Sequence, residues 1–305
     1  MTATPVCAYF SVYHKKSVIY ANEWVYPIQT GFLQHNVDLG FLKDSDGINI
    51  SSKNKNFAEL TAHYWVWKNY FPSFNGKYIG FCHYRRFLSL NCNVIDQYKT
   101  NPVQILYSNF SKLFDKNYAI DAFIDFCGDC DVIVPQKTVF KNQSVLSQYI
   151  SQHPKRDLDA CFSVICKKYP DYIPFCDAFF KGNSGYFCLN FIMKKELFDN
   201  WCKWIFDILN DLEKQSDYSM YNSYATIRTP AYLAERLFNV WLMYQIEKKS
   251  LKIRESPLYL LCEETDISYK KKIFPGIRFI RKGIFRTLRI FGIKIPFPKV
   301  NVIPR

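Results

Sequence analysis

Short apolar runs that end in polar residues constrain the fold of this chain more than any other feature of its sequence. Val6 to Val12, Lys77 to Tyr84 and Asp131 to Pro135 each have the length and content of a buried strand. Apolar residues recur at helical spacing between and after these runs, at 56–70, 155–168, 195–212 and from Pro230 onward. Buried strands that alternate with helices predict an α/β fold with a single, mostly parallel central sheet flanked by helices.

The composition indicates a globular chain whose charge is unevenly distributed. Hydrophobic residues make up 49% and aromatic residues 18% of the 305 positions, more than a disordered chain carries. One large domain at residues 1–265 with a short appendage at 266–305 fits this length. The formal net charge is +13, yet the stretch from Lys270 to Lys299 holds ten basic side chains and no acidic one. Most of the positive charge therefore belongs to the appendage.

The appendage has the pattern of a basic amphipathic helix. Apolar residues recur at spacings of three and four from Ile277 to Ile295, and cations occupy the remaining positions. Such a helix lies in a membrane interface with its cations among anionic headgroups. We therefore predict peripheral attachment to an anionic membrane surface through Lys270 to Lys299. Packing of the helix on its own domain or on a partner is the alternative.

Cysteine usage and the N-terminal residues favour a cytoplasmic location. The eleven cysteines form an odd, scattered set, and the N-terminal residues lack the basic-then-apolar pattern of a signal peptide. We expect a reducing cytoplasm. No apolar run approaches the roughly 20 residues that span a bilayer, so we expect a peripheral position on the inner face of the cytoplasmic membrane.

The spacings of cysteines and acidic residues leave metal binding open. Cys127 and Cys130 have half the spacing of a zinc site, but no second pair follows to complete a tetrahedral shell. We interpret them as structural. Asp-x-Asp pairs occur at 44–46 and 129–131, and neither follows the end of a predicted strand. The sequence therefore establishes no cofactor, and a divalent metal ion stays an alternative.

Cationic residues gather at the ends of two predicted strands. His83, Arg85 and Arg86 end the second strand, and His14 and Lys15 follow the first. In open α/β sheets ligands bind at the carboxyl ends of the strands. Adjacent guanidinium groups supply donor pairs that match phosphate oxygens, so these residues predict an anion site. A surface ion pair with a nearby carboxylate is the alternative.

Glu59 and the aromatic residues after it have two interpretations each. Glu59 stands three residues after Asn56, the spacing of a capping box that closes the start of a helix, and it is also a candidate titratable group. Tyr64 and Trp65 lie in the helix that follows, where they either join the core or form a platform for a sugar ring.

Two later segments are further candidates. Ser184, Gly185 and Tyr186 form a small-residue turn that either lets a ligand approach the backbone or is a plain turn. Glu235 and Arg236 follow Pro230 on a helix and project sideways from its apolar face. They are either a solvated pair or one lip of an active site.

Motif absences exclude several common classes. The sequence has no phosphate-binding P-loop, no dinucleotide GxGxxG, no GxSxG and no HExxH. A nucleic-acid-binding protein would interleave basic and aromatic residues across its folded face, whereas here most of the excess positive charge lies at the end of the chain. We therefore expect no nucleic acid as partner.

Several ordered sequence blocks together resemble one family, the bacterial polysaccharide glycosyltransferases catalogued as domain of unknown function 4422. The likeness runs from about Val6 to Leu261 and leaves the basic appendage outside. The blocks that carry it are Asn49-Ile50-Ser51, Glu59-Leu60-Thr61, Tyr64 to Asn69, Tyr78-Ile79-Gly80, His83 to Phe87, Asp131 to Pro135, Ser184-Gly185-Tyr186, Phe191 to Phe198 and Glu235 to Leu242.

The resemblance implies a GT-A-like nucleotide-diphosphate-sugar transferase fold over residues 1–265. It implies inverting transfer of a hexosyl residue, galactofuranose included, from a nucleotide-diphosphate sugar to a lipid-linked oligosaccharide. Capsule, lipopolysaccharide and exopolysaccharide assembly are the implied settings. Many GT-A enzymes end a strand in an acidic metal-binding pair, whereas the corresponding strand here ends in His83, Arg85 and Arg86. We expect the arginines to replace the charge of the metal.

The resemblance also implies roles for single residues. Glu235 is the expected catalytic base and Glu59 the second candidate, while His83 assists the arginines. Asn49 and Ser51 join His14 and Lys15 at the donor. The expected contacts to the acceptor sugar come from Tyr64, Trp65, Ser184, Gly185, Tyr186 and Arg236. A non-catalytic module that binds nucleotide-sugar or carbohydrate is the competing class, because it would keep the arginines and aromatic rings without needing a base.

Overall fold

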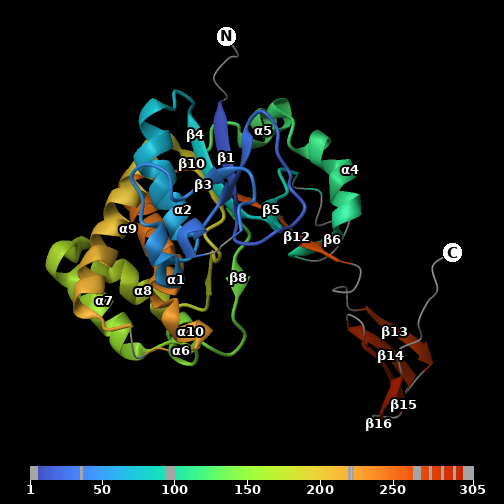
Figure 1. Ribbon diagram of the computed structural model, residues 1–305. Coiled ribbons are helices and arrows are strands. Elements are labelled where there is room, and N and C mark those ends of the chain that lie inside the picture. The colour runs from blue at the N-terminus through green and yellow to red at the C-terminus, as the bar shows by residue number, and fades with distance from the viewer. Residues whose placement is uncertain are drawn as a thin grey trace.

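A ten-stranded sheet forms the centre of the molecule (Figure 1). The computed structural model describes residues 6–34, 37–91, 93, 101–218, 221, 223–263, 269–274, 277–282, 285–290 and 293–297. The main path of the sheet has the order β11-β7-β10-β4-β1-β2-β3. Its strands are β1 (Cys7–Tyr13), β2 (Val25–Gln29), β3 (Leu42–Lys43), β4 (Tyr78–His83), β7 (Val132–Pro135), β10 (Phe191–Lys194) and β11 (Ile253–Ser256).

The sheet is mostly parallel, as the alternation of strands and helices predicts. β1 pairs in parallel with β2 and β4, β2 with β3, and β11 with β7, while β10 runs antiparallel between β4 and β7. A side branch leaves β4 through a single pairing of His83 with Arg86. It consists of β5 (Arg86–Leu88), β12 (Leu258–Cys262) and β6 (Val103–Leu106). A separate short pair joins β8 (Thr138–Val139) to β9 (Ser184–Gly185).

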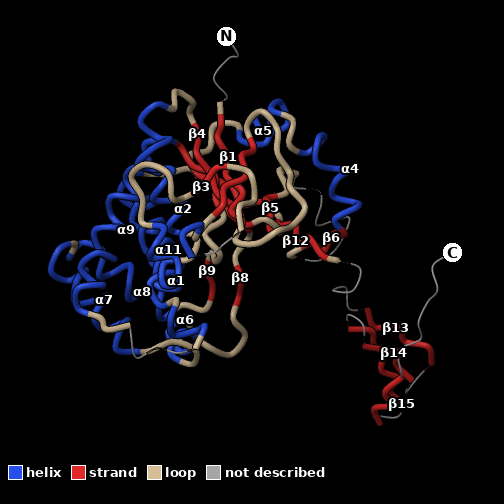
Figure 2. The backbone as a smooth tube through the Cα atoms, in the orientation of Figure 1, coloured by secondary structure: helices blue, strands red, loops and turns tan. Residues whose placement is uncertain are grey.

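Helices lie on both sides of the sheet (Figure 2). One group comprises α1 (Asn54–Phe57), α2 (Leu60–Trp65), α6 (Val145–Ile150), α7 (Lys155–Lys168), α8 (Ile173–Lys181), α9 (Lys195–Gln215), α10 (Tyr224–Ile227) and α11 (Thr229–Lys249). On the other side lie α4 (Tyr107–Asn117) and α5 (Ile120–Cys127). Within the described residues, no helix has the length and apolarity that a membrane crossing requires.

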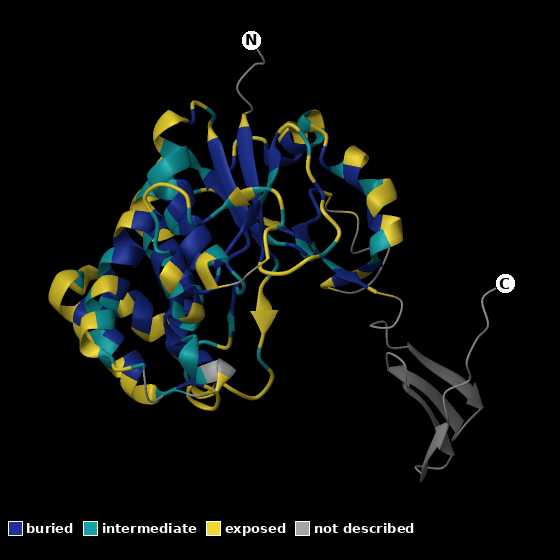
Figure 3. Ribbon diagram, viewed as in Figure 1, coloured by how far each residue is buried: buried dark blue, intermediate teal, exposed yellow. Residues whose placement is uncertain are grey.

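Strand periodicity divides the core into two apolar clusters. The strands at the centre of the sheet are buried (Figure 3). Ala8, Phe10 and Val12 of β1 join the cluster that contains α9 and α11, whereas Cys7 and Tyr9 join the cluster that contains α4 and α5. Successive strand residues point to opposite faces, so a strand that is buried on both faces must be apolar at nearly every position. This explains why β1 reads as a continuous apolar run and confirms the predicted layered α/β architecture.

The structure corrects the prediction of a C-terminal amphipathic helix. The segment forms a four-stranded antiparallel sheet of β13 (Tyr269–Phe274), β14 (Ile277–Lys282), β15 (Phe285–Ile290) and β16 (Ile293–Phe297). Short runs of isoleucine, phenylalanine and arginine satisfy a period of two as well as a helical period. The sequence repeats glycine at 276, 283 and 292, and such spacing with β-branched and aromatic residues between favours strands.

Candidate active site

Two adjoining hollows lie at the carboxyl ends of β1 and β4, where the sheet topology predicts a ligand site. The first has a volume of 310 Å³ and the second 230 Å³. The first is also lined by Val12, His14, Thr30, Asn54, Tyr84 and Arg85, and the second by Cys188, Ala231, Tyr232 and Glu235. Both are lined by Ala58, Glu59, His83, Arg86 and Arg228.

The first hollow is cationic. Arg85 of the turn between β4 and β5 and Arg86 at the start of β5 both line it, as the strand-end pattern predicts. Arg228, the residue that precedes α11, also lines this hollow. Guanidinium groups stay charged at any working pH and bind phosphate oxygens through paired N–H donors. The arrangement therefore suits an anion such as a diphosphate.

His83 has a lowered pKa, so the positive charge of the first hollow at neutral pH comes from its arginines. Nε2 of His83 donates a hydrogen bond of 2.8 Å to the carbonyl oxygen of Cys188 and lies 3.7 Å from Oε1 of Glu59. Burial lowers the pKa of His83 to about 4, and the neighbouring charge of Arg86 acts in the same direction. The imidazole therefore contributes a fixed N–H and no positive charge.

Glu59 does not close a capping box. The helix expected from Asn56 onward breaks at Ala58, whose φ of 46° separates α1 from α2, and the Glu59 side chain makes no capping hydrogen bond. The carboxyl group turns instead toward His83 and both hollows, with only 12% of the side chain exposed. Burial raises the pKa of Glu59, although Arg228 and Arg86 oppose the rise.

The strained backbone of Ala58 is held by three side chains. Its carbonyl oxygen accepts hydrogen bonds from Nδ2 of Asn54 at 2.7 Å, from Oγ1 of Thr61 at 3.1 Å and from Oγ1 of Thr30 at 3.2 Å. A left-handed conformation at a residue with a β-carbon persists only where its surroundings over-determine it. This network therefore decides where the adjacent Glu59 points.

Asp44 borders that network, because its carboxylate contacts Oγ1 of Thr61. Asn49 and Ser51, which were expected at the donor, line neither hollow. The buried carboxylate of Asp44 accepts hydrogen bonds from the backbone N–H of Gly31 and from Oγ of Ser51, each at 2.6 Å. Asn49 donates to the carbonyl oxygens of Ser45 and Gly47. These polar side chains therefore form hydrogen bonds within their own loop. In the described part of the chain, no cluster of three or more histidine, cysteine or acidic residues could hold a metal ion.

Glu235 lines the second hollow from the first turns of α11. Its Oε2 accepts a hydrogen bond of 3.0 Å from Arg236, and 15% of its side chain is exposed. Burial raises the pKa of Glu235 to about 7, the nearby Glu59 adds to the rise, and Arg236 and Arg86 oppose it. A carboxyl group that exchanges a proton near neutral pH is suited to general acid–base chemistry.

Ser184, Gly185 and Tyr186 position this site without lining it. Asn239, one turn after Glu235, accepts a hydrogen bond from the backbone N–H of Tyr186 at 2.7 Å and donates to its carbonyl at 2.8 Å. A β-carbon on Gly185 would lie 3.0 Å from Asn239 and 2.8 Å from Phe179, so the glycine permits close packing against protein and not against ligand. The segment thereby fixes the following turn, which carries Cys188.

Tyr64 and Trp65 belong to the packed interior and line neither hollow. The Tyr64 ring meets Phe206 of α9 edge-on at 5.0 Å, and Nε1 of Trp65 donates to the carbonyl oxygen of Asp46 at 2.6 Å. This packing agrees with their interpretation as core residues, and neither ring lines a hollow. Lys15 also lies outside the lining, with its ammonium 5.9 Å from the ring of Tyr84.

Arg228 and Cys188 are site residues that the sequence reasoning missed. Arg228 stands two residues before Pro230, the proline that marks the start of α11. A cation is unfavourable at the N-terminal end of a helix, so its presence there was the available indication of a functional residue. Cys188 has a φ of 70° and is followed by Leu189 at 45°. No glycine marks this turn, so no sequence pattern pointed to it.

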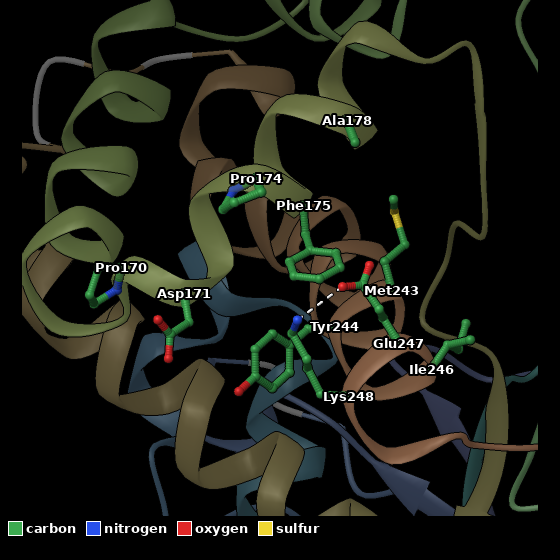
Figure 4. Close-up of a pocket in the computed structure, with 10 residues that line it drawn as sticks. All are labelled: Pro170, Asp171, Pro174, Phe175, Ala178, Met243, Tyr244, Ile246, Glu247 and Lys248. Carbon is green, nitrogen blue, oxygen red and sulfur yellow. Dashed lines mark hydrogen bonds and ion pairs between the residues drawn. The ribbon is translucent and has the colours of Figure 1, made fainter.

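A larger hollow of 650 Å³ lies toward the other end of α11 (Figure 4). Its lining is largely apolar, and two of its charged groups, Glu247 and Lys248, pair with each other at 3.0 Å. None of the predicted site residues lines it. It therefore lacks the convergent titratable groups that distinguish the two smaller hollows.

Comparison with known families agrees with the residues on which the resemblance was based. Residues 9–247 match the family model described as Domain of unknown function (DUF4422). The chain belongs to this family. The two hollows, with Glu59, His83, Arg86, Arg228 and Glu235, all lie within the matched range of the DUF4422 domain.

This DUF4422 chain shares its fold with a solved glycosyltransferase, described as the WbbM bifunctional glycosyltransferase in its apo form. The TM-score is 0.71 and the sequence identity 27%, over 88% of this chain. The match spans 48% of the solved chain, so the DUF4422 protein corresponds to about half of that bifunctional protein. The comparison with curated proteins found no match.

Proposed function

We propose that the protein is a glycosyltransferase that transfers a hexosyl residue from a nucleotide-diphosphate sugar, with inversion, during bacterial surface polysaccharide synthesis. The observation that carries the proposal is the meeting of buried carboxyl groups and arginines around one site at the carboxyl end of the sheet. The fold shared with a solved glycosyltransferase supports it. Galactofuranose remains within the proposed hexosyl donors.

The chemistry is a direct displacement at the anomeric carbon. Glu235 removes the proton from the acceptor hydroxyl as the oxygen forms a bond to that carbon. The bond from the carbon to the diphosphate oxygen breaks, and its electron pair leaves with the diphosphate. A raised pKa suits the carboxyl group of Glu235 for this step at neutral pH. We place the acceptor in the second hollow, which Glu235 lines.

The departing diphosphate lies in the first hollow in this proposal. Arg85, Arg86 and Arg228 supply positive charge aimed at the place where negative charge develops. Asp44 is occupied by protein donors, and Asp131 pairs with Lys194 at 2.5 Å. These contacts support arginine rather than a metal ion as the source of charge.

We also propose a lipid-linked oligosaccharide as acceptor and a position on the inner face of the cytoplasmic membrane. The ten cations between Lys270 and Lys299 support this, because each cation near an anionic surface adds about 1 kcal/mol of attraction. This contribution depends on charge, so it survives the replacement of the expected helix by strands. Capsule, lipopolysaccharide and exopolysaccharide assembly are the proposed settings.

A screen of nucleotide-sugars tests the function. The purified protein is incubated with each donor and a lipid-linked acceptor, and transfer is measured beside the melting temperature with nucleoside diphosphate or with nucleic acid. We expect transfer from one donor and stabilisation by the matching diphosphate. Stabilisation without transfer or hydrolysis of any donor would identify a binding module. Stabilisation by nucleic acid alone would contradict the proposal.

A further inference from the structure

Arg236 is buried directly behind Glu235. The residue is 4% exposed and lines neither hollow. Its Nη1 donates to Oε2 of Glu235 at 3.0 Å, and its Nη2 donates to Oε1 of Gln148 at 2.9 Å. A buried charge is costly unless it is paired and hydrogen-bonded, so these contacts are what keep the guanidinium in place.

Three aromatic rings enclose the same guanidinium. Its carbon lies 5.2 Å from the ring centre of Phe187, 5.5 Å from that of Tyr149 and 5.9 Å from that of Tyr232. Tyr149 comes from α6, next to Gln148, and Phe187 from the segment after β9. Elements on both sides therefore fix the direction in which Arg236 presents its charge.

We propose that Arg236, held by Gln148 and its ring enclosure, is a positioning residue that orients the Glu235 carboxylate toward the acceptor and supplies its counter-charge. This replaces the earlier expectation of a sugar contact, because the guanidinium is closed off from both hollows. The inference rests on the proposed function, in which Glu235 is the base. Arg236 then acts on the reaction through Glu235 alone.

The groups around Glu235 come from several elements. Arg86 of β5 and Arg228 before α11 add positive charge, whereas Glu59 before α2 adds negative charge. His83 of β4 is neutral, and the backbone of Cys188 gives Glu235 a hydrogen bond. Among these influences, Arg236 is the largest that lowers the pKa of Glu235. Removing its charge should therefore raise that pKa further.

The test compares pH profiles of kcat/KM for Arg236→Gln, Arg236→Lys and Gln148→Leu. At pH values below the pKa of Glu235, each unit by which this pKa rises lowers kcat/KM about tenfold. At pH values well above the pKa, kcat/KM changes little. We expect Arg236→Gln to shift the acid limb upward by about one unit or more and to leave donor affinity unchanged. Arg236→Lys keeps the charge but loses the paired donors, so its shift should be smaller.

Gln148→Leu keeps every charge and removes one anchor of Arg236, so it should give a small shift in the same direction. If Arg236→Gln does not fold, the pH profile of Gln148→Leu tests the positioning role instead. Arg156→Gln is the matched control, since this arginine lies on the surface of α7 with 55% of its side chain exposed. It should leave the profile unchanged.

Two failures are distinguishable. If Glu235→Gln is inactive while the folded Arg236 and Gln148 variants keep the wild-type acid limb, the positioning role is wrong and the proposed function stands. A drop that is equal at every pH also overturns the positioning role, because a merely structural defect gives that result. If Glu235→Gln is fully active, the proposed base is itself wrong.

Discussion

Oε1 of Glu59 lies 3.7 Å from Nε2 of His83, although the two residues belong to different elements. The same nitrogen donates its proton to the carbonyl of Cys188, so the imidazole is fixed in one tautomer. Glu59 therefore faces an N–H edge, whereas Glu235 faces the guanidinium of Arg236. Two carboxyl groups with different partners are suited to different tasks, and in the proposed mechanism Glu235 is the base while Glu59 is a fixed polar group beside it.

Replacing Glu235 with Gln should lower kcat by about 10²- to 10⁴-fold, because the substitution keeps the size of the side chain and removes the base. Donor affinity should change little, since Glu235 lines only the second hollow. Steady-state kinetics and donor titration measure both quantities. Glu247→Gln on the same helix, with 60% of its side chain exposed, is the control. Normal turnover by Glu235→Gln together with an inactive Glu59→Gln would move the base to Glu59.

The pH dependence of kcat/KM should show an acid limb near pH 7. Burial raises the pKa of Glu235 to about 7, so the carboxyl group is protonated below that pH and cannot accept a proton. The rate therefore rises as the pH rises through this value. The lowered pKa of His83, about 4, predicts no limb from this histidine between pH 5 and 8. A flat profile over that range would contradict the assignment of the base.

Arg86→Lys should raise the barrier by on the order of 3 kcal/mol, because one ammonium group cannot reproduce paired guanidinium donors at a developing charge. Arg85→Lys should cost less, since Arg85 lines only the first hollow and Arg86 lines both. Arg156→Lys on α7 is the control. Activity is measured with and without added divalent metal. Full activity of both variants without metal would remove the arginines from the mechanism.

Asp44→Asn should destabilise the fold by about 1–3 kcal/mol, because an amide cannot accept all the hydrogen bonds that this buried carboxylate accepts. The backbone N–H of Gly31 and the hydroxyl of Ser51 donate to different oxygens of Asp44, so one of the two donors loses its acceptor in the variant. Asp46→Asn, at an exposed residue two positions on, should change stability little. Denaturant unfolding measures both. If the two variants were equally stable and added divalent metal restored their activity, Asp44 and Asp46 would instead be a metal-binding pair.

A chain that ends at Tyr269 should lose affinity for anionic vesicles and still act on a soluble acceptor analogue. The removed segment, 270–305, carries eleven basic residues and no acidic one, and β13–β16 pair with one another in a sheet of their own. Vesicle co-sedimentation over a range of salt concentrations measures the loss. Full-length protein with Lys270, Lys271 and Lys272 replaced by Gln tests charge alone and should show intermediate binding. Unchanged binding by the shortened chain would refute the attachment.

Local pattern was sufficient to predict the sheet and several helices. The predicted segment 155–168 coincides with α7, and the runs at Val6 to Val12 and Lys77 to Tyr84 differ from β1 and β4 by one residue at each end. Strand ends then placed His83, Arg85 and Arg86 at the carboxyl edge of the sheet. These predictions succeed because the burial of an element on one or both faces imposes its periodicity directly on neighbouring residues.

Tertiary structure alone decided which side chains share the site. Asn56 and Glu59 have the spacing of a capping box, but hydrogen bonds from Asn54, Thr30 and Thr61 break the helix at Ala58 and turn Glu59 toward His83. Arg228 reaches the same hollows from a point far along the chain. The sequence by itself determined the elements and their polar ends, because those depend on neighbours in the chain. The direction of each buried polar side chain depends on partners that only the packing of distant segments supplies.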